Sequence, residues 1–334
     1  LTSGTLAPLD TFSYDLGLDF KVRLENPHVV PKENVWAGVV TKGPTAHPLN
    51  GSFNTRDDPL YLSNMGQTLV NISRVVPGGV IVFFPSYSML STCISAWRYK
   101  GRDVPNSIWD MIEKNKHVLV EPKYSSQLPS VMEEYTAKIT SGGGAMFIAV
   151  ARGKVSEGLD FSDDAARAVV VIGVPYPSKN DPKVKLKRQF MDDAAKQQQQ
   201  AGAINGSMWY SQQAMRAVNQ SIGRVIRHIA DYGAIILCDD RFAPPSTQGM
   251  LSVWLRPSLK VYNSFGDVSR SLVSFFKAKT APPVPTASTS DAAAPPVVHP
   301  NQTDTKTETL KKKPNTASSS SSSSSSRVLP LGHY

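Results

Sequence analysis

The sequence has only two cysteines and no long apolar run, and each shortage excludes a class of protein. Cys93 and Cys238 lie far apart, each within an apolar stretch, so we expect both to be small core residues in a reducing compartment. Two cysteines cannot supply the four thiolates of an iron–sulfur cluster or of an all-cysteine zinc site. No apolar run approaches the roughly 20 residues that cross a bilayer, so we expect no membrane partner.

The sequence also lacks the loops and ligand patterns of a complete nucleotide-hydrolysing site. No G-x-x-x-x-G-K-[ST] loop is present, and Gly142–Gly144 is not followed by lysine. Asp239–Asp240 comes nearest to an Asp-Glu pair after an apolar strand, and the six histidines show no metal-ligand spacing. We therefore expect no metal site in this chain, and we expect that the chain alone cannot cradle and hydrolyse a nucleotide.

Size and charge fit a soluble globular protein with an anionic partner. The chain has 334 residues, 40% of them hydrophobic, enough for one large or two ordinary domains with a core. A net charge of +9 and a pI near 9.4 favour nucleic acid as that partner. Residues 1–8 begin with leucine and carry no basic region. We therefore expect no signal peptide, and we expect the sequence to be a fragment or a mis-started gene model.

Short apolar runs alternate with amphipathic stretches along residues 35–277. Runs bounded by turn signals predict buried parallel strands at residues 35–40, 80–84, 118–121, 145–151, 169–174 and 233–238. Apolar spacings of three and four predict helices between them, for instance at Leu62, Met65, Leu69, Ile72 and Val76. Ser86 or Ser88 is expected to cap one helix, and Pro129 to lie in the first turn of another. The alternation predicts an α/β fold with helices on both faces of a parallel sheet.

The composition changes at about residue 278. Proline, alanine, threonine and serine dominate from there, and Ser318–Ser326 is an unbroken serine tract. Such a stretch cannot bury enough apolar surface to offset the entropy of ordering, so we expect residues 278–334 to be a disordered tail. Lys311–Lys313 fits part of a nuclear-import signal, but such a cluster is more often only solubilising.

Two arginines follow a glycine in a helix predicted at residues 207–228. Gln220, Arg224 and Arg227 are spaced by four and three, so they would share one face of that helix. Gly223 lowers helix stability by about 1 kcal/mol relative to alanine. Close approach of two guanidinium groups to a polyphosphate would offset that loss. A solvated arginine face with an incidental glycine explains the pattern equally well.

Charged and aromatic residues follow two of the predicted strands, at the place where parallel sheets bind ligands. After strand 145–151 come two glycines, two cations and two acceptors, namely Gly153, Gly158, Arg152, Lys154, Glu157 and Asp160. A phosphate or sugar would use this mixture, but considered alone it fits an ordinary surface loop better. After strand 80–84, Ser86 and Tyr87 offer a hydroxyl and an aromatic ring to a nucleotide. Helix capping explains Ser86 almost as well.

Four stretches occur in the order of helicase motifs III to VI. They read Thr2-Ser3-Gly4-Thr5-Leu6, Phe83-Phe84-Pro85-Ser86-Tyr87, Gly153 to Phe161 and Gln220 to Arg227. Over residues 1–277 the chain resembles the second motor domain of superfamily 2 helicases of the xeroderma pigmentosum group D type, an iron–sulfur family. Within that family, Trp209–His228 and Trp254–Gly266 are most similar to the telomere-elongation branch. The Fanconi anaemia group J branch is the alternative.

The resemblance implies two RecA-like domains with ATP and Mg²⁺ bound in the cleft between them. Residues 1–30 would end the first domain, and residues 31–277 would form the second. The Walker A lysine, the Asp-Glu-Ala-His box, the arch domain and the cysteines of a 4Fe–4S cluster would all lie upstream of Leu1. The implied partners are single-stranded and structured DNA and the first motor domain of the same full-length chain.

The resemblance also implies a role for each motif residue. Arg224 and Arg227 would be arginine fingers that stabilise the transferring phosphoryl group, and Gln220 would orient the γ-phosphate or the attacking water. The nucleotide side would be lined by Gly153, Glu157, Gly158, Asp160 and Gly223. Contacts to the single strand would come from Lys154, Ser86 and Tyr87. Ser3 and Thr5 would link the nucleotide state to domain movement.

Two functions from different classes are compatible with these residues. The resemblance implies the C-terminal half of an ATP-dependent 5′–3′ DNA helicase, acting in DNA repair and telomere maintenance in the nucleus. The alternative is a truncated, non-catalytic module that binds nucleic acid or regulates a partner. Arg224 and Arg227 favour the helicase, because a pure binding module has no use for arginine fingers.

Overall fold

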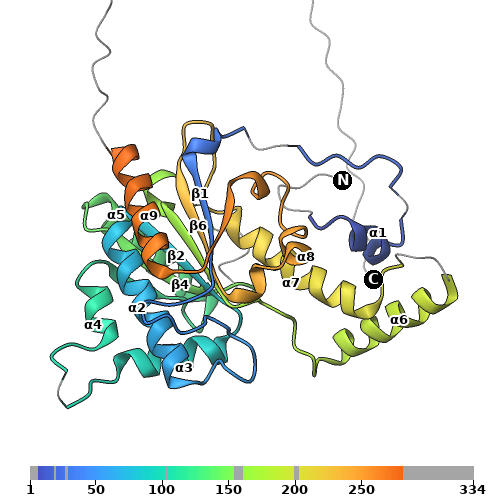
Figure 1. The fold of residues 1–334 in the computed structure, drawn as a ribbon, viewed down its shortest axis with the longest axis horizontal. Coiled ribbons are helices and arrows are strands. Elements are labelled where there is room, and N and C mark those ends of the chain that lie inside the picture. The colour runs from blue at the N-terminus through green and yellow to red at the C-terminus, as the bar shows by residue number, and fades with distance from the viewer. Residues whose placement is uncertain are drawn as a thin grey trace, which may run out of the picture. The chain divides into compact units, whose positions relative to one another are not determined.

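Seven short segments pair side by side into one parallel sheet at the centre of the fold (Figure 1). The computed structural model describes residues 7–18, 20–26, 29–102, 104–153, 161–198 and 203–280, with only the backbone of Gln198. Within these residues the strand order is β3-β4-β2-β5-β6-β1-β7. The strands are β1 (Val35–Val40), β2 (Gly79–Phe84), β3 (His117–Val120), β4 (Ala145–Val150), β5 (Ala168–Ile172), β6 (Gly233–Cys238) and β7 (Leu259–Tyr262).

All six predicted strands are present, with ends shifted by at most two residues. The seventh strand, β7, was not predicted. It pairs with β1 at the edge of the sheet, and its four residues are half-buried or exposed. An edge strand of this kind has neither a continuous apolar run nor a clean alternation, so its sequence carries little strand signal.

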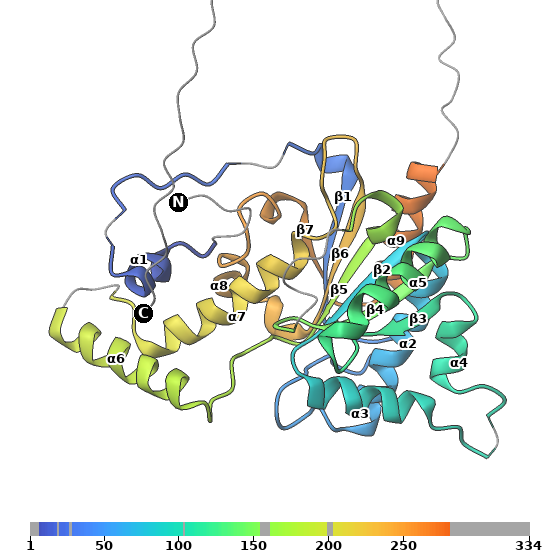
Figure 2. The ribbon, with the colours of Figure 1, turned by 180° about the vertical axis from the view of Figure 1, so that it is seen from behind.

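Helices cover both faces of the sheet, as Figures 1 and 2 show from opposite sides. One core contains residues of α2 (Pro59–Val75), α3 (Tyr87–Arg98), α4 (Ile108–Glu113) and α9 (Phe265–Thr280). The other contains residues of α5 (Leu128–Thr140) and α7 (Gly206–Ile222). Strand β2 contributes side chains to both cores, because alternate side chains of a strand point to opposite faces. Val80, Val82 and Phe84 pack in the first core, and Ile81 and Phe83 in the second.

Helix α6 and several shorter elements complete the fold. Helix α6 (Pro182–Gln198) packs along α7, and the two lie beside the sheet together with α1 and α8 (Figure 2). The remaining elements are α1 (Asp10–Leu16), α8 (Pro245–Gln248) and the 3-10 turns η1 (Lys32–Asn34), η2 (Ser125–Gln127), η3 (Asp163–Ala166), η4 (Asp240–Phe242) and η5 (Arg256–Ser258). Of the two predicted caps, Ser86 is the one that caps α3: its hydroxyl accepts the N–H of Met89.

The predicted helix at residues 207–228 is shorter than expected, because α7 ends at Ile222. Gly223 is the C-cap, and its N–H donates to the carbonyl of Asn219 at 3.1 Å. The expectation of one helical face for Gln220, Arg224 and Arg227 is therefore wrong. The chain turns because Val225 and Ile226 are buried in the core ahead of β6. A Cβ on Gly233 would lie 2.3 Å from Cγ1 of Val225, so this turn packs closely against the start of that strand.

The described residues lie within one compact unit, residues 1–282. The division at residue 30 and the disordered tail at 278–334 stay predictions, and residues 281–334 are outside the described part of the chain. In the part that the structure describes, no helix has both the length and the apolar character needed to cross a bilayer.

Candidate functional site

The carboxyl edge of the sheet, where the strands end, brings together residues from motifs IV and V. The Tyr87 hydroxyl donates to Oε1 of Glu121 at 3.0 Å, and the Val150 N–H donates to Oε2 at 2.9 Å. A Cβ on Gly153 would lie 2.7 Å from both Glu121 oxygens and 2.9 Å from the Tyr87 hydroxyl. A larger residue would therefore displace these side chains, and Tyr87 and Gly153 lie together around a buried carboxylate, with Ser86 adjacent to Tyr87 in the sequence.

Glu121 was not predicted as a site residue. It is only 7% exposed and lies directly after β3. The signal that would have found it is a carboxylate at the end of a predicted apolar strand, since a buried charge in that position needs partners.

A second buried carboxylate, Asp239, lies at the same edge after β6. It is fully buried and accepts the N–H groups of Gly51 at 2.9 Å and of Arg241 at 3.0 Å. The Arg241 side chain adds two bonds of 2.7 Å, from Nε and Nη2, in a bidentate pair. Burial lowers the pKa of Arg241, but the hydrogen bonds and charge of Asp239 outweigh it and raise the pKa overall. Burial and the charge of Asp239 raise the pKa of neighbouring Asp240.

The arginine turn of motif VI, residues 223–228, lies at the amino edge, where the strands begin. The main-chain N–H of Arg227 donates to Oδ2 of Asp231 at 3.0 Å. Asp231 is 1% exposed and forms an ion pair of 2.8 Å with Nη1 of Arg167, which is 5% exposed. His228 contacts Oδ1 of Asp163 at 2.9 Å, in the turn that precedes β5. The turn is thus anchored to the starts of two strands, with Arg227 exposed and Arg224 half-buried.

Among the described residues, one group has ligand atoms close enough together to hold a metal ion, namely Asp163, His228 and Asp231. Asp231 uses both oxygens for N–H donors, because Oδ1 also accepts the N–H of Tyr232 at 2.9 Å. Its negative charge is compensated by Arg167. The donor set therefore fits an ion pair with hydrogen bonds better than it fits a cation.

Motif V connects the two edges. Strand β4 ends at Val150 on the carboxyl edge, and the chain next enters β5 at Ala168 on the amino edge, two positions away in the strand order. Phe161 anchors the crossing, with its ring centroid 5.7 Å from that of Tyr135 and 6.3 Å from that of Phe147. Four predicted site residues fall outside the described part of the chain, namely Lys154, Glu157, Gly158 and Asp160.

Ser3 and Thr5 also lie outside the described residues, but the segment that follows them docks on α7. The Thr11 N–H donates to Oε1 of Gln212 at 3.2 Å. Arg216 donates to the Thr11 hydroxyl at 3.0 Å, and Nδ2 of Asn219 donates to the carbonyl of Ala7 at 3.1 Å. The three α7 residues are spaced by four and three, so they form a polar stripe that ends one residue before Gln220. The sequence analysis missed this stripe, although its spacing is visible.

The donor set of the arginine turn fits the phosphates of a nucleotide. Gln220, Arg224 and Arg227 bring an amide and two guanidinium groups within eight residues, and guanidinium groups bind phosphate oxygens bidentately. Among the described residues that anchor the turn, only Asp163 and Asp164 have a carboxylate oxygen that is not already hydrogen-bonded, and both residues are exposed. Mg²⁺ therefore fits this edge less well than phosphate does.

The two thiols do not fit an iron–sulfur cluster. Cys93 and Cys238 are fully buried and not bonded to each other. Burial raises the pKa of Cys93 to about 12 and raises the pKa of Cys238 still further. Both are therefore protonated core residues, as the sequence analysis expected.

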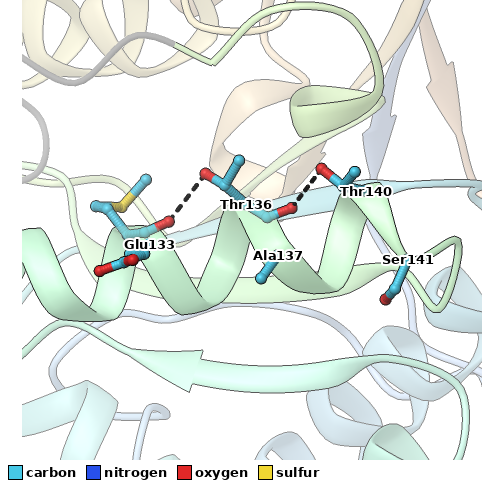
Figure 3. A pocket seen from close by; sticks show the side chains of 6 residues that line it. Glu133, Thr136, Ala137, Thr140 and Ser141 are labelled. Carbon is cyan, nitrogen blue, oxygen red and sulfur yellow. Dashed lines mark hydrogen bonds between the residues drawn. The ribbon is translucent and has the colours of Figure 1, made fainter.

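A hollow of about 740 Å³ lies along the outer side of α5 and is open to solvent (Figure 3). It is lined by Met132, Glu133, Thr136, Ala137, Thr140 and Ser141. The hydroxyls of Thr136 and Thr140 donate to carbonyls one turn back in the same helix. No predicted site residue lies there, so this hollow adds no chemistry to the two edges.

The sequence matches known proteins over most of its length. Residues 69–258 match the helicase C-terminal domain family. The regulator of telomere elongation helicase 1 homolog of Oryza sativa subsp. japonica is 49% identical over 287 residues, covering 84% of this chain and 28% of that protein. Regulator of telomere elongation helicase 1 of Bos taurus is 47% identical over 293 residues, covering 86% of this chain and 24% of that protein. The chain spans about a quarter of the length of these curated relatives.

Two solved structures share the fold. One, described as XPD helicase, superposes with a TM-score of 0.52 at 19% identity and covers 78% of this chain and 42% of that one. The other, described as XPD in the apo form, has a TM-score of 0.51 at 19% identity and covers 78% and 47%. These likenesses confirm the expected parallel sheet with helices on both faces.

Proposed function

Because this chain belongs to the helicase C-terminal domain family, we propose that it forms the second motor half of an ATP-dependent DNA helicase that moves 5′ to 3′. The names of its relatives support action in telomere maintenance, and with it DNA repair in the nucleus. The chain spans about a quarter of those relatives. The phosphate loop, the Mg²⁺ ligands and the 4Fe–4S cluster are accordingly proposed for the rest of the full-length chain.

The observation that carries the proposal is the anchored arginine turn. Asp231 holds the main chain at Arg227 and is itself held by Arg167, and both anchors are buried. Electrostatic stabilisation of a transferring phosphoryl group requires that the charged groups are held in position before the reaction, and an anchored main chain provides this. Bound ATP supplies that phosphoryl group. In the proposal Arg224 and Arg227 bind its oxygens as arginine fingers, and Gln220 orients the attacking water or the γ-phosphate.

The carboxyl edge is proposed to bind the single strand. Ser86 and Tyr87 contact the strand there, and Lys154 adds a positive charge. Glu121 acts as a positioning residue, because it holds the Tyr87 hydroxyl while leaving half of that side chain exposed. Tyrosine faces stack on bases with little regard to sequence, as a helicase that moves along varied DNA requires.

Coupling between the edges is proposed to run through two segments. Motif V starts beside Tyr87, and two residues after its end Asp163 contacts His228. Glu157, Gly158 and Asp160 are therefore proposed to couple the strand to the nucleotide. The segment after Ser3 and Thr5 docks on the polar stripe of α7. Movement of the first motor domain is thereby transmitted to the helix that leads into the arginine turn.

ATP turnover, measured with and without oligo(dT), tests this function. Residues 1–334 alone are expected to show no strand-stimulated hydrolysis, whereas the full-length protein is expected to show it. Arg227→Ala in the full-length protein abolishes that turnover, and Arg270→Ala, the same change on exposed α9, leaves it intact. Stimulated turnover by residues 1–334 that disappears on Arg227→Ala would contradict the half-motor. Full-length protein that binds strands without hydrolysing ATP would favour the non-catalytic module.

A further inference from the structure

A cavity of about 440 Å³ opens at the carboxyl edge beside β5 and β6. Its lining residues come from the segment that leaves β5, the first half of α7, and the segment from Arg241 to α8. Its walls include an aromatic ring, thioethers, a hydroxyl and a guanidinium group, from Tyr176, Met208, Ser211, Met215, Arg241 and Met250. None of these residues has a role in the proposed ATP or strand contacts described so far.

The aromatic wall of the cavity is held rigidly. The ring of Tyr176 stacks on that of Tyr210 with centroids 5.0 Å apart and planes 15° apart. The Tyr210 hydroxyl donates to the carbonyl of Pro177 at 2.7 Å. Arg152, at the end of β4, donates through Nε to the carbonyl of Pro175 at 3.3 Å. Tyr176 therefore lies between two main-chain anchors, and it still exposes 37% of its surface.

The cationic wall lies next to motif IV. Gly173 has a φ of +67°, a conformation that favours glycine. A Cβ there would lie 3.4 Å from Cγ of Pro85 and 3.8 Å from Nη2 of Arg241. Arg241 uses Nε and Nη2 to bind Asp239, and Nη1 forms no hydrogen bond to a described residue. A charged donor thus lies beside the residue that precedes Ser86.

We propose that this cavity binds one nucleobase of the single strand, with Arg241 directed at the adjoining phosphate. The inference rests on the proposed strand-binding function and extends its track from motif IV to β6. A base has flat apolar faces and polar edges, which match a tyrosine face with thioethers and a hydroxyl. The volume lies in the range of ligand pockets, about 300–1,000 Å³. Lys179 and Arg188 lie within 6.0 and 5.1 Å of the Tyr210 ring, so the surroundings favour an anionic ligand.

Binding of fluorescein-labelled oligo(dT) of about 12 nucleotides, compared with an abasic strand of the same length and charge, tests the pocket. Wild-type residues 1–334 are expected to prefer oligo(dT) in fluorescence anisotropy, and the pocket is expected to contribute roughly tenfold, the effect of stacking one base, in addition to stacking on Tyr87. Ser211→Phe fills the cavity without changing charge, so the preference is expected to fall by roughly tenfold. Ser274→Phe makes the same change on exposed α9 and should keep it.

The outcomes separate this inference from the proposed function. Wild type that binds both strands equally contradicts the pocket together with the proposed stacking on Tyr87. Ser211→Phe that keeps the full preference contradicts the pocket and leaves strand binding intact. Wild type that binds neither strand contradicts both. Photocrosslinking with 5-iododeoxyuridine provides a readout that does not depend on folding of the variant. Crosslinks at Tyr176 or Met208 are expected in the wild type, and crosslinks confined to other residues would contradict the pocket.

Discussion

Among the described residues, the carboxyl edge of the sheet buries two carboxylates, Glu121 and Asp239, whereas the amino edge buries two cations and only one carboxylate, Asp231, which is paired with a cation. At the carboxyl edge, Glu121 and Asp239 are at most 7% exposed. Each accepts main-chain N–H groups, from Val150 in the first case and from Gly51 and Arg241 in the second. Each also holds a side chain that reaches solvent, Tyr87 or Arg241.

At the amino edge the buried groups include the cations Lys116 and Arg167, which are 6% and 5% exposed, and Asp231, which is 1% exposed and pairs with Arg167. Lys116 donates to the carbonyl of Gly78 at 2.8 Å, and Arg167 donates to the carbonyl of Tyr232 at 2.9 Å. Arg167 also stacks over the Tyr232 ring, 4.0 Å from its centroid. These cations tie turns of the chain to one another.

The difference follows from backbone polarity. Helices such as α3 begin at the carboxyl edge and present unpaired N–H groups there, and helices such as α7 end at the amino edge and present carbonyls. Burying a hydrogen-bond acceptor therefore costs less free energy at the carboxyl edge, and burying a donor costs less at the amino edge. The first edge can position exposed side chains for a strand, while the second can lock a turn for a nucleotide.

The largest expected effect separates the two edges kinetically. In the full-length protein, Arg227→Ala is expected to lower kcat for ATP hydrolysis by about 10³-fold or more, because the proposed arginine finger would act on the transition state. The oligo(dT) concentration for half-maximal stimulation should stay unchanged. Tyr87→Ala should raise that concentration roughly tenfold with kcat preserved at saturation. Steady-state kinetics with varied oligo(dT) measures both. If both variants changed the same parameter, the edges would share one role.

The next effect concerns stability at the amino edge. Arg167→Met leaves Asp231 buried without its partner, so we expect the free energy of unfolding to fall by about 3–5 kcal/mol. Urea denaturation of residues 1–334 measures it. Adding Asp231→Leu removes the orphaned charge and should restore much of the loss. If the double variant were no more stable than Arg167→Met, desolvation of Asp231 would not be the cause.

A smaller effect depends on pH. Burial lowers the pKa of Lys116 from 10.5 to about 8. Between these values the unfolded chain binds more protons than the folded one, so stability rises with pH through this window. Relative to Lys116→Met, wild type should gain up to about 3 kcal/mol from pH 8 to 10.5. Urea denaturation at several pH values measures the difference between the two proteins. A difference that is flat or falls with pH would contradict the shift.

Much of the fold could be predicted because its signals are local. Six strands were found from short apolar runs, and the helices between them from spacings of three and four. The edge strand β7 was missed because half of its surface faces solvent. The end of α7 was missed as well. Val225 and Ile226 continue the helical spacing of apolar residues, but the chain leaves the helix before them and buries them in the core ahead of β6.

The candidate site was likewise predicted only in part. Ser86, Tyr87, Gly153 and the arginines were predicted from the sequence motifs, and the structure brings Tyr87 and Gly153 together. Glu121 and Asp239 were not predicted, because a carboxylate in the sequence does not reveal whether it is exposed or buried. The pocket beside Tyr176 joins three segments, and no single one of them indicates a cavity.

By itself, the sequence determined the parallel sheet, its two helical layers and the chemical groups offered by each motif, since run length and periodicity are properties of neighbouring residues. Only the tertiary structure decided which edge of the sheet each motif occupies and which buried residues contact it. The Tyr87–Glu121 contact joins residues 34 positions apart, and the Thr11–Gln212 contact joins residues 201 positions apart. Such pairings depend on how strands order themselves in the sheet, which burial of the whole core selects.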